Sequence, residues 1–218
     1  MHDAVQDAVE KAWSDVVDTA RRTVTDGLVV GTSGNVSARV GDLVLITPTG
    51  VPYHRLGPDD AVAVDLDGRQ VRGELRPSSE LPMHLAVYRR TPARTIVHTH
   101  APHATAVSAL VDKLPNIHYM AGAMGGQIHV ARYALYGTEE LAGAVLKALG
   151  DRTGCLMRNH GTLVHADTLD RAYDHTAQLE WMCRVWLLAR AANDTSPRTL
   201  SQRDITRAAA KLKGYGQD

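Results

Sequence analysis

The sequence contains no phenylalanine and only two cysteines, Cys155 and Cys183, among its 218 residues. The two cysteines lie far apart and match no metal-binding or redox spacing, so we expect a reducing, cytoplasmic environment. The missing phenylalanine does not argue against a packed core, because Trp, Tyr and Leu can fill one. Apolar residues make up 44% and charged residues 22% of the chain, which is ordinary usage for a folded globular protein.

The sequence also lacks an excess of charge of either sign and has no long apolar run. Lys and Arg number 24, as do Asp and Glu, so the formal charge is zero and gives no bias toward nucleic acid or anionic lipid. No window approaches the roughly 18 apolar residues of a membrane span, and the acidic start MHDAVQDAVEKAW is unlike a signal peptide. We therefore expect neither a nucleic-acid nor a membrane partner, and any anion must be bound by a local site.

Neither internal repeats nor a linker divide the chain, so we expect one domain over residues 1–218. The phosphate-binding pattern G-x-x-x-x-G-K-[ST] is absent, and no G-x-G-x-x-G follows a strand-like segment. A nucleotide ligand is therefore not indicated.

Helical periodicity is clearest near the N-terminus and in the C-terminal half. Apolar residues recur every three or four positions from Ala4 to Val24, and Gly27 ends the pattern. A second helix is predicted in RPSSELPMHLAVYRRTP, with Ser79 as its cap. The remaining predicted helices are APHATAVSAL, TEELAGAVLKALG with Thr138 as its cap, residues 168–192, and a last short helix opened by the capping box SQRD at 201–204.

Strand-like segments alternate with these helices. NVSARV, DLVLITPTG and a hairpin in AVAVDLDGRQVRG, which turns at Asp67 and Gly68, follow the first helix. RTIVHTH, NIHYM, QIHVARY and the strand-turn-strand segment GCLMRNHGTLVHA come later. This alternation predicts an α/β fold: a three-layer α/β/α architecture with a largely antiparallel central sheet.

Three histidines lie within six positions of one another in the segment RTIVHTHAPH. In a strand, residues two apart project to the same side with Cα atoms about 6 to 7 Å apart, so His98 and His100 can reach one metal ion. His160, in a turn between two apolar runs, offers a third ligand, and Glu80 could complete the set. Taken alone, an H-x-H pair among eleven histidines arises more often without a function. His103 and the other histidines are expected to be surface or core residues.

Three short segments rich in glycine and small hydroxyl residues are candidates for an anion site. They are GTSGN at 31–35, TPTG at 47–50 and PSSE at 77–80. Free backbone N–H groups and hydroxyls are what a phosphate needs when the site is built from main chain. Each segment alone is more often an ordinary turn, and spacing does not show whether the three meet in space.

Seven motifs follow one another along the chain: GTSGNVSAR, ITPTG, RPSSE, IVHTHAPHATAVS, IHYMAGAMGG, ARYALYGT and RNHGTLV. In this order they resemble the class II aldolase/adducin family, most closely its members that cleave L-fuculose 1-phosphate. The resemblance implies a zinc-dependent lyase that cleaves a sugar 1-phosphate into dihydroxyacetone phosphate and an aldehyde, L-lactaldehyde in the fuculose case, by retro-aldol chemistry. It also implies a cyclic homotetramer with active sites between neighbouring subunits.

The resemblance implies a role for each metal-ligating residue. His98, His100 and His160 are similar to the family's zinc ligands, and Glu80 to the residue that ligates zinc at rest and acts as general base once substrate displaces it. Three neutral histidines leave zinc its charge and open positions. Zinc can then stabilise, as a Lewis acid, the negative charge of the enediolate that cleavage leaves.

Further roles are implied around the substrate. Tyr119 resembles a proton-donating tyrosine contributed by a neighbouring subunit, and a tyrosine can supply the different pKa that such an acid needs. Tyr215 resembles a mobile C-terminal tyrosine near the substrate. The implied phosphate pocket consists of Asn35, Thr49, Gly50, Ser78 and Ser79.

Two positions depart from the family pattern and leave alternatives open. Tyr136 stands where the aldolases have phenylalanine, and no basic residue follows Tyr215. The resemblance implies that both positions border the aldehyde end of the substrate. One alternative is a pentulose-5-phosphate 4-epimerase, in which PSSD stands where this chain has PSSE. Glu80 and Tyr119 favour the aldolase over it. A sugar-phosphate decarboxylase or dehydratase of the same superfamily is another, and the metal ligands argue against a non-catalytic adducin-like assembly module.

Overall fold

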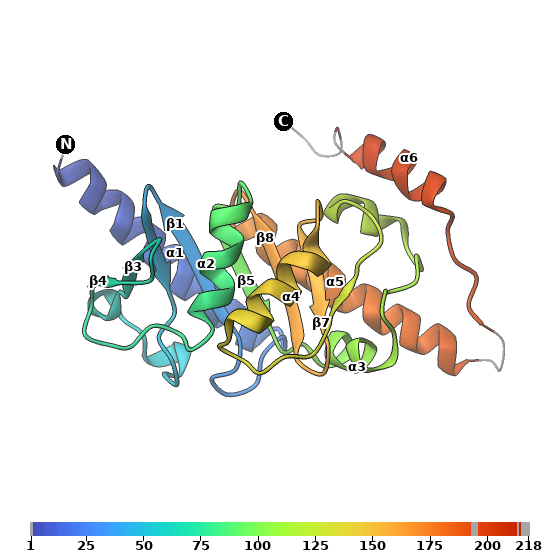
Figure 1. The fold of residues 1–218 in the computed structure, drawn as a ribbon, viewed down its shortest axis with the longest axis horizontal. Coiled ribbons are helices and arrows are strands. Elements are labelled where there is room, and N and C mark those ends of the chain that lie inside the picture. Colours follow the sequence, from blue (N-terminus) through green and yellow to red (C-terminus); the bar gives the residue numbers. More distant parts are fainter. Residues whose placement is uncertain (1, 193–195, 213, 215–218) are drawn as a thin grey trace.

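The computed structural model describes residues 2–192, 196–212 and 214 (Figure 1). An eight-stranded sheet runs through the molecule in the order β4-β3-β2-β1-β5-β8-β7-β6. Neighbouring strands are antiparallel except β6 and β7, which pair in parallel. The strands are β1 (Asn35–Val40), β2 (Leu43–Ile46), β3 (Ala63–Asp65), β4 (Gln70–Arg72), β5 (Thr95–Thr99), β6 (Val130–Ala131), β7 (Gly154–Met157) and β8 (Gly161–Ala166).

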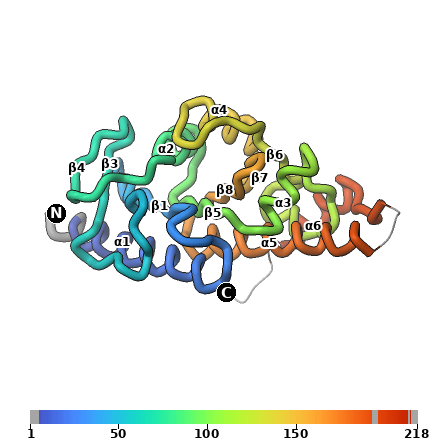
Figure 2. Tube along the Cα trace, turned by 90° about the horizontal axis from the view of Figure 1, so that it is seen from below, coloured from blue at the N-terminus to red at the C-terminus, as the bar shows by residue number. Residues whose placement is uncertain are grey.

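Helices cover both faces of this sheet, as the view in Figure 2 shows. The helices α2 (Leu81–Arg90) and α4 (Glu139–Leu149) lie on one face, and α1 (His2–Thr25) and α5 (Leu169–Ala191) lie on the other. The remaining helical elements are η1 (Tyr53–Arg55), η2 (Pro58–Asp60), α3 (Pro102–Leu110), which packs against α5, η3 (Tyr119–Met124), and α6 (Gln202–Leu212), which packs against η3. The predicted α/β/α architecture with a largely antiparallel sheet is therefore confirmed.

The core follows from the two-residue period of the strands. In β2, Val44 and Ile46 pack toward α2, where Met83 is buried, whereas Leu45 packs toward α1 and its buried Val16. Alternate side chains of one strand thus contribute to cores on opposite faces of the sheet. The periodic apolar positions of the first predicted helix form the buried face of α1.

Two predictions about local structure are wrong. NIHYM is not a strand: His118 is the N-cap of η3, and its ring nitrogen accepts a hydrogen bond from the Met120 amide, which curls the chain. Gly122 of η3 also packs tightly against α6, because a Cβ on this residue would lie 3.0 Å from the backbone of α6. Ser79 is not the cap of α2, because Glu80 occupies that position and accepts no capping bond.

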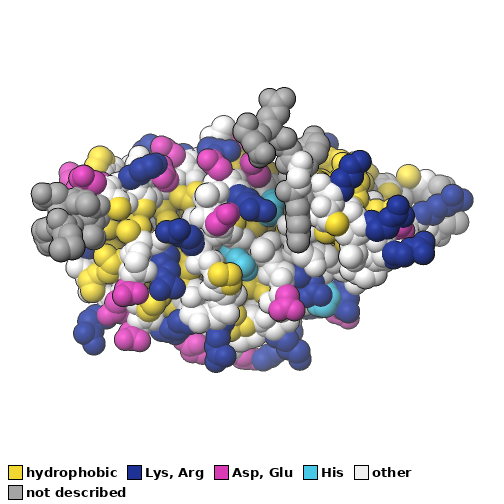
Figure 3. Space-filling model, turned by 90° about the horizontal axis from the view of Figure 1, so that it is seen from above, with side chains coloured by type: hydrophobic (Ala, Val, Ile, Leu, Met, Phe, Trp, Pro, Cys, Tyr) yellow, Lys and Arg dark blue, Asp and Glu magenta, His cyan; other side chains and the backbone are white. Residues whose placement is uncertain are grey.

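The surface carries charges of both signs. In Figure 3, basic and acidic side chains are interspersed over the left and middle of the view. Within the described ranges, no helix combines the length and the hydropathy that crossing a bilayer requires.

Candidate metal and phosphate site

The antiparallel pair β5 and β8 brings the three candidate histidines together. His98 is on β5 opposite Leu163, His100 follows the end of β5, and His160 directly precedes β8. The close approach of the two strands depends on Gly161, because a Cβ on this residue would lie 2.0 Å from the carbonyl oxygen of Thr99. A glycine immediately after His160 therefore lets its backbone sit beside the two histidines of β5.

Glu80 reaches the histidines from the start of α2. One carboxylate oxygen, Oε2, lies 2.9 Å from Nε2 of His98, and the other, Oε1, lies 3.2 Å from Nε2 of His160. His98 and His100 face each other with their Nε2 atoms 3.0 Å apart. One ligand atom from each of these four residues falls within 4.8 Å of all the others. The structure thus brings together the four residues that the sequence indicates as metal ligands.

The polarity of this cluster fits a divalent cation. Nδ1 of His98 lies 2.7 Å from the carbonyl oxygen of Thr162 and must donate to it, so a neutral His98 turns the lone pair of Nε2 toward the cluster. That lone pair then faces a carboxylate oxygen and another imidazole nitrogen. Oε1 of Glu80 is buried without a hydrogen-bond partner among the described residues. Three imidazoles and a carboxylate are the donor types that zinc prefers.

The pKa values of Glu80, His98 and His100 are shifted because these groups are buried close together. Burial raises the pKa of the Glu80 carboxyl, but the charge of His98 and the close ring nitrogens of His160 and His98 outweigh burial and hold the pKa well below its usual range. Burial lowers the pKa of His98, and the Glu80 carboxylate more than offsets this and raises it. Burial, reinforced by the neighbouring His98 and His160, lowers the pKa of His100 to about 3. A proton on Nε2 of His98 separates its lone pair from those of Glu80 and His100. A bound cation would do the same.

A cavity of about 370 Å³ opens directly beside this cluster, and the three small-residue segments meet in it. An isolated bridge between Pro48 and Pro77 holds TPTG against PSSE, and the amide of Thr49 donates to the carbonyl of Arg76 over 3.1 Å. The lining of the cavity includes every residue of the implied phosphate pocket, namely Asn35, Thr49, Gly50, Ser78 and Ser79. Glu80, His100 and His160 line the same cavity. A phosphate bound by the segments would thus lie next to the metal ligands.

Sequence reasoning missed other residues that line the cavity. Tyr133 joins Tyr136 at its rim, where both side chains are largely exposed. Asn159 also lines it and has a φ of 54°, so its backbone is left-handed. An asparagine two residues before Gly161 in RNHG is a signal for such a turn, because asparagine tolerates positive φ better than most residues.

Of the two predicted catalytic tyrosines, Tyr119 is not among the residues that line this cavity. Tyr119 lies on η3 with 47% of its surface exposed, and its ring packs beside His118. Tyr215 falls outside the described residues. His103, which the sequence leaves out of the ligand set, pairs with Glu180 of α5, whose Oε1 lies 2.6 Å from its Nδ1.

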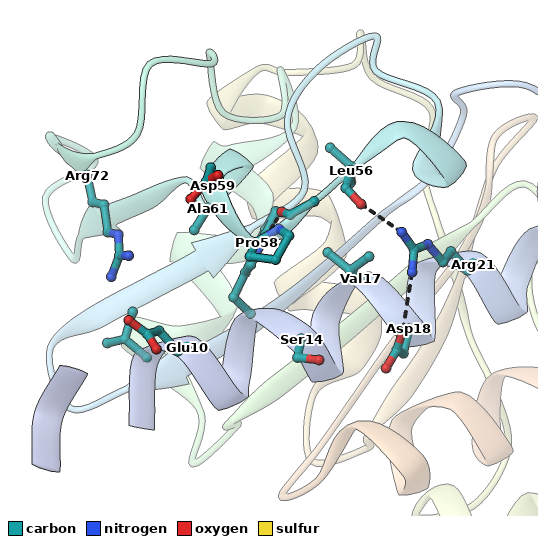
Figure 4. Close-up of a pocket in the computed structure, with 13 residues that line it drawn as sticks. Glu10, Ser14, Val17, Asp18, Arg21, Leu56, Pro58, Asp59, Ala61 and Arg72 are labelled. Carbon is teal, nitrogen blue, oxygen red and sulfur yellow. Dashed lines mark hydrogen bonds and ion pairs between the residues drawn. The ribbon is translucent and has the colours of Figure 1, made fainter. Parts of the chain in front are cut away.

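A second cavity, between α1 and the segment that contains η2, lacks such chemistry (Figure 4). Its charged groups are largely engaged with the protein itself. Arg21 donates to the carbonyl of Leu56 over 2.7 Å and pairs with Asp18, as the dashed lines in Figure 4 show. Among the described residues that line it, none is a histidine or a cysteine. The cluster around Glu80 is therefore the stronger candidate for a catalytic site.

Comparison with known proteins places this arrangement in a family. Residues 14–187 match the family described as Class II Aldolase and Adducin N-terminal domain. The L-fuculose phosphate aldolase of Escherichia coli strain K12 is 40% identical over 203 residues, which cover 92% of this chain and 94% of that protein. The 5-deoxy-D-ribulose 1-phosphate aldolase of Bacillus thuringiensis serovar kurstaki is 33% identical over 212 residues, or 96% of this chain and 99% of that protein.

The solved structures agree with the sequence comparisons. An L-fuculose 1-phosphate aldolase superposes with a TM-score of 0.89 at 33% identity, and the match covers 93% of this chain and 96% of that one. The match of fold and sequence extends over nearly the whole of both chains. The chain therefore belongs to the class II aldolase and adducin family.

Proposed function

We propose that the protein is a zinc-dependent aldolase that cleaves a ketose 1-phosphate, with L-fuculose 1-phosphate as first candidate, into dihydroxyacetone phosphate and an aldehyde. One observation carries the proposal: Glu80 and three histidines converge at the wall of a cavity that three small-residue segments also line. A metal beside an anion site suits cleavage of a phosphorylated ketose, because the site can hold the phosphate while the metal stabilises the enediolate.

The proposed roles follow from the chemistry of each group. His98, His100 and His160 hold the zinc ion with Glu80, and a bound zinc ion would stabilise as a Lewis acid the negative charge that develops on substrate oxygens. Asn35, Thr49, Gly50, Ser78 and Ser79 hold the phosphate through amides and hydroxyls. These five residues offer no cationic side chain, so backbone N–H groups carry much of that binding.

Glu80 is the proposed general base and acid at carbon. Its carboxylate is ionised, because its pKa lies well below the usual range. In the aldol direction, the ionised carboxylate takes a proton from the carbon next to the carbonyl, and in cleavage it returns that proton to the same carbon. Replacement by the neutral isostere Gln removes the proton acceptor, so Glu80→Gln is expected to lower kcat by about 100-fold or more.

Tyr119 and Tyr215 complete the proposed machinery. We propose that Tyr119 reaches the cavity of a neighbouring copy in a homotetramer and donates the proton that the leaving or forming alkoxide requires. Its exposure on η3 supports this role, because a side chain that serves another subunit must lie on the surface of its own. Tyr215 is proposed to act near the substrate, as the family resemblance implies.

We further propose that residues 1–218 form one domain that acts in the cytoplasm. One continuous sheet through the part of the chain that the structure describes supports the first statement. The two cysteines, which are buried and unpaired, support a reducing compartment.

The relatives leave two substrates to be compared. L-fuculose 1-phosphate and 5-deoxy-D-ribulose 1-phosphate both yield dihydroxyacetone phosphate when the bond between carbons three and four breaks, and they differ in the aldehyde. Purified protein is expected to hold about one zinc ion per chain and to release dihydroxyacetone phosphate from at least one of them in a coupled assay. If a pentulose 5-phosphate is epimerised and no triose phosphate appears, the aldolase proposal is wrong.

A further inference from the structure

A buried line of polar side chains runs from Glu80 into the core between α2 and β1. Glu80, the N-cap of α2, and His84 and Tyr88 on the helix are spaced four residues apart and share one side of it. On β1, Asn35 and Ser37 are two apart and share one side of the strand. Both His84 and Ser37 are fully buried, so water cannot replace the partners of either.

Four hydrogen bonds connect these five residues. Nδ2 of Asn35 donates to Oε2 of Glu80 over 3.0 Å, and Oδ1 of Asn35 lies 2.5 Å from Nε2 of His84. Nδ1 of His84 lies 2.7 Å from Oγ of Ser37. The Ser37 hydroxyl lies 2.7 Å from the hydroxyl of Tyr88.

The charge of Glu80 fixes the direction of every bond in the line. An ionised carboxylate only accepts, so Asn35 must turn its NH₂ group toward Glu80 and its oxygen toward His84. Nε2 of His84 must then carry a proton and donate it. Burial lowers the pKa of His84 to about 3, so the ring is neutral and its Nδ1 accepts from the Ser37 hydroxyl. The Ser37 oxygen is left to accept from Tyr88.

We propose that His84 is a positioning residue for Glu80: by donating to Oδ1 of Asn35, it prevents the Asn35 amide from turning over and so holds the Glu80 carboxylate toward the histidines. If the amide turned over, its oxygen would face the carboxylate and repel it. This inference rests on the proposed function, in which Glu80 is both metal ligand and base. Nothing in the sequence distinguishes His84 from an ordinary core histidine.

Two polar substitutions of His84 test the inference as a matched pair. The amide nitrogen of Gln lies near the place of the imidazole Nε2, so His84→Gln can still donate to Asn35. Asn is shorter and can replace only the contact to Ser37, so His84→Asn leaves Asn35 free to turn. Both variants keep a polar group in the core. His175→Leu is the control for loss of a buried histidine, since His175 lies on α5 and takes no part in the line.

The affinity of full-length protein for Zn²⁺, measured by competition with a chelator, is the first readout. His84→Asn is expected to weaken it on the order of ten- to a hundredfold, and His84→Gln to stay within about threefold of wild type, because groups that orient metal ligands have effects of this size. His175→Leu is expected to match wild type. Equal affinities for the Gln and Asn variants would overturn the inference.

Crystal structures of the metal-free variants give a second readout that does not depend on the proposed function. The contact between Asn35 and Glu80, 3.0 Å in the native chain, is expected to persist in His84→Gln and to be broken in His84→Asn. Its persistence in both variants would overturn the role of His84. If wild-type protein bound no zinc, the proposed function would fail, while these structures would still decide whether His84 orients Asn35.

Discussion

Gly161 lies so close to Thr99 that a Cβ added to it would be 2.0 Å from the Thr99 carbonyl oxygen. No real Cβ tolerates that distance, and the neighbour is backbone of the central strand β5, which cannot move aside alone. The two residues belong to the ends of adjacent strands, where His98, His100 and His160 converge. The contact therefore sets the spacing of the candidate metal ligands.

The variant Gly161→Ala is expected to separate β8 from the end of β5. We expect the free energy of unfolding to fall by about 1 to 3 kcal/mol, the usual cost of overpacking, and zinc content to fall because His160 moves with β8. Urea denaturation of metal-free protein and metal analysis measure the two effects. Gly143→Ala is the matched control: Gly143 lies on α4 with nothing within 4 Å of an added Cβ. It is expected to stabilise the protein by about 0.5 to 1 kcal/mol.

The four-residue cluster predicts different outcomes for a histidine inside it, His160, and one outside it, His103. His160→Ala removes a proposed ligand, so zinc content per chain and the rise of Tm on addition of zinc are expected to fall sharply. His103→Ala removes a partner of Glu180 outside the cluster and is expected to leave zinc content unchanged. Metal analysis of dialysed protein measures both. Equal zinc loss in the two variants would contradict the assignment of the ligands.

Much of this site was predictable because its parts are local in sequence. The two-residue period of a strand is enough to place His98 and His100 on one side of β5. The identity of the third and fourth ligands depends on how β8 and α2 pack. The order of motifs along the chain indicated His160 and Glu80 without showing a contact between them. Composition likewise identified TPTG and PSSE as anion-binding candidates, but their meeting depends on the bridge between Pro48 and Pro77.

The errors of the sequence analysis arise where tertiary contacts decide the local structure. Tyr119 lies in a segment with strand-like composition, yet the His118 ring and the packing of Gly122 against α6 produce the helix η3. His84 has the apolar neighbours of an ordinary core histidine in LPMHLAV, and only the pairing of α2 with β1 reveals its contact with Asn35. The partners in that case are 49 residues apart along the chain.

Acid is expected to destabilise the metal-free protein through its buried neutral histidines. Burial lowers the pKa of His84 from 6.5 to about 3 in the folded chain. Below pH 6.5 the unfolded chain therefore binds a proton that the folded chain does not, and stability falls as pH falls through this range. From pH 7.5 to 5.5 the loss for His84 is about 1.4 kcal/mol.

Urea denaturation at the two pH values measures this loss. His84→Gln removes the titrating group, so the free energy of unfolding of that variant is expected to depend less on pH. An unchanged pH dependence in His84→Gln would contradict the neutral, buried state of His84.

Tyr136 lines the cavity at a position where the aldolases that the chain resembles have phenylalanine, and it offers a hydroxyl that phenylalanine lacks. L-fuculose 1-phosphate has a hydroxyl on carbon five, whereas 5-deoxy-D-ribulose 1-phosphate has none there. If the Tyr136 hydroxyl binds that group, Tyr136→Phe loses one neutral hydrogen bond for the first substrate and nothing for the second. A bond of this kind contributes about 0.5 to 1.5 kcal/mol, so kcat/KM for L-fuculose 1-phosphate relative to the other substrate is expected to fall roughly 2- to 10-fold. The ratio is its own control, because general damage to the site lowers kcat/KM for both substrates together. An unchanged ratio would exclude Tyr136 from recognition of the aldehyde.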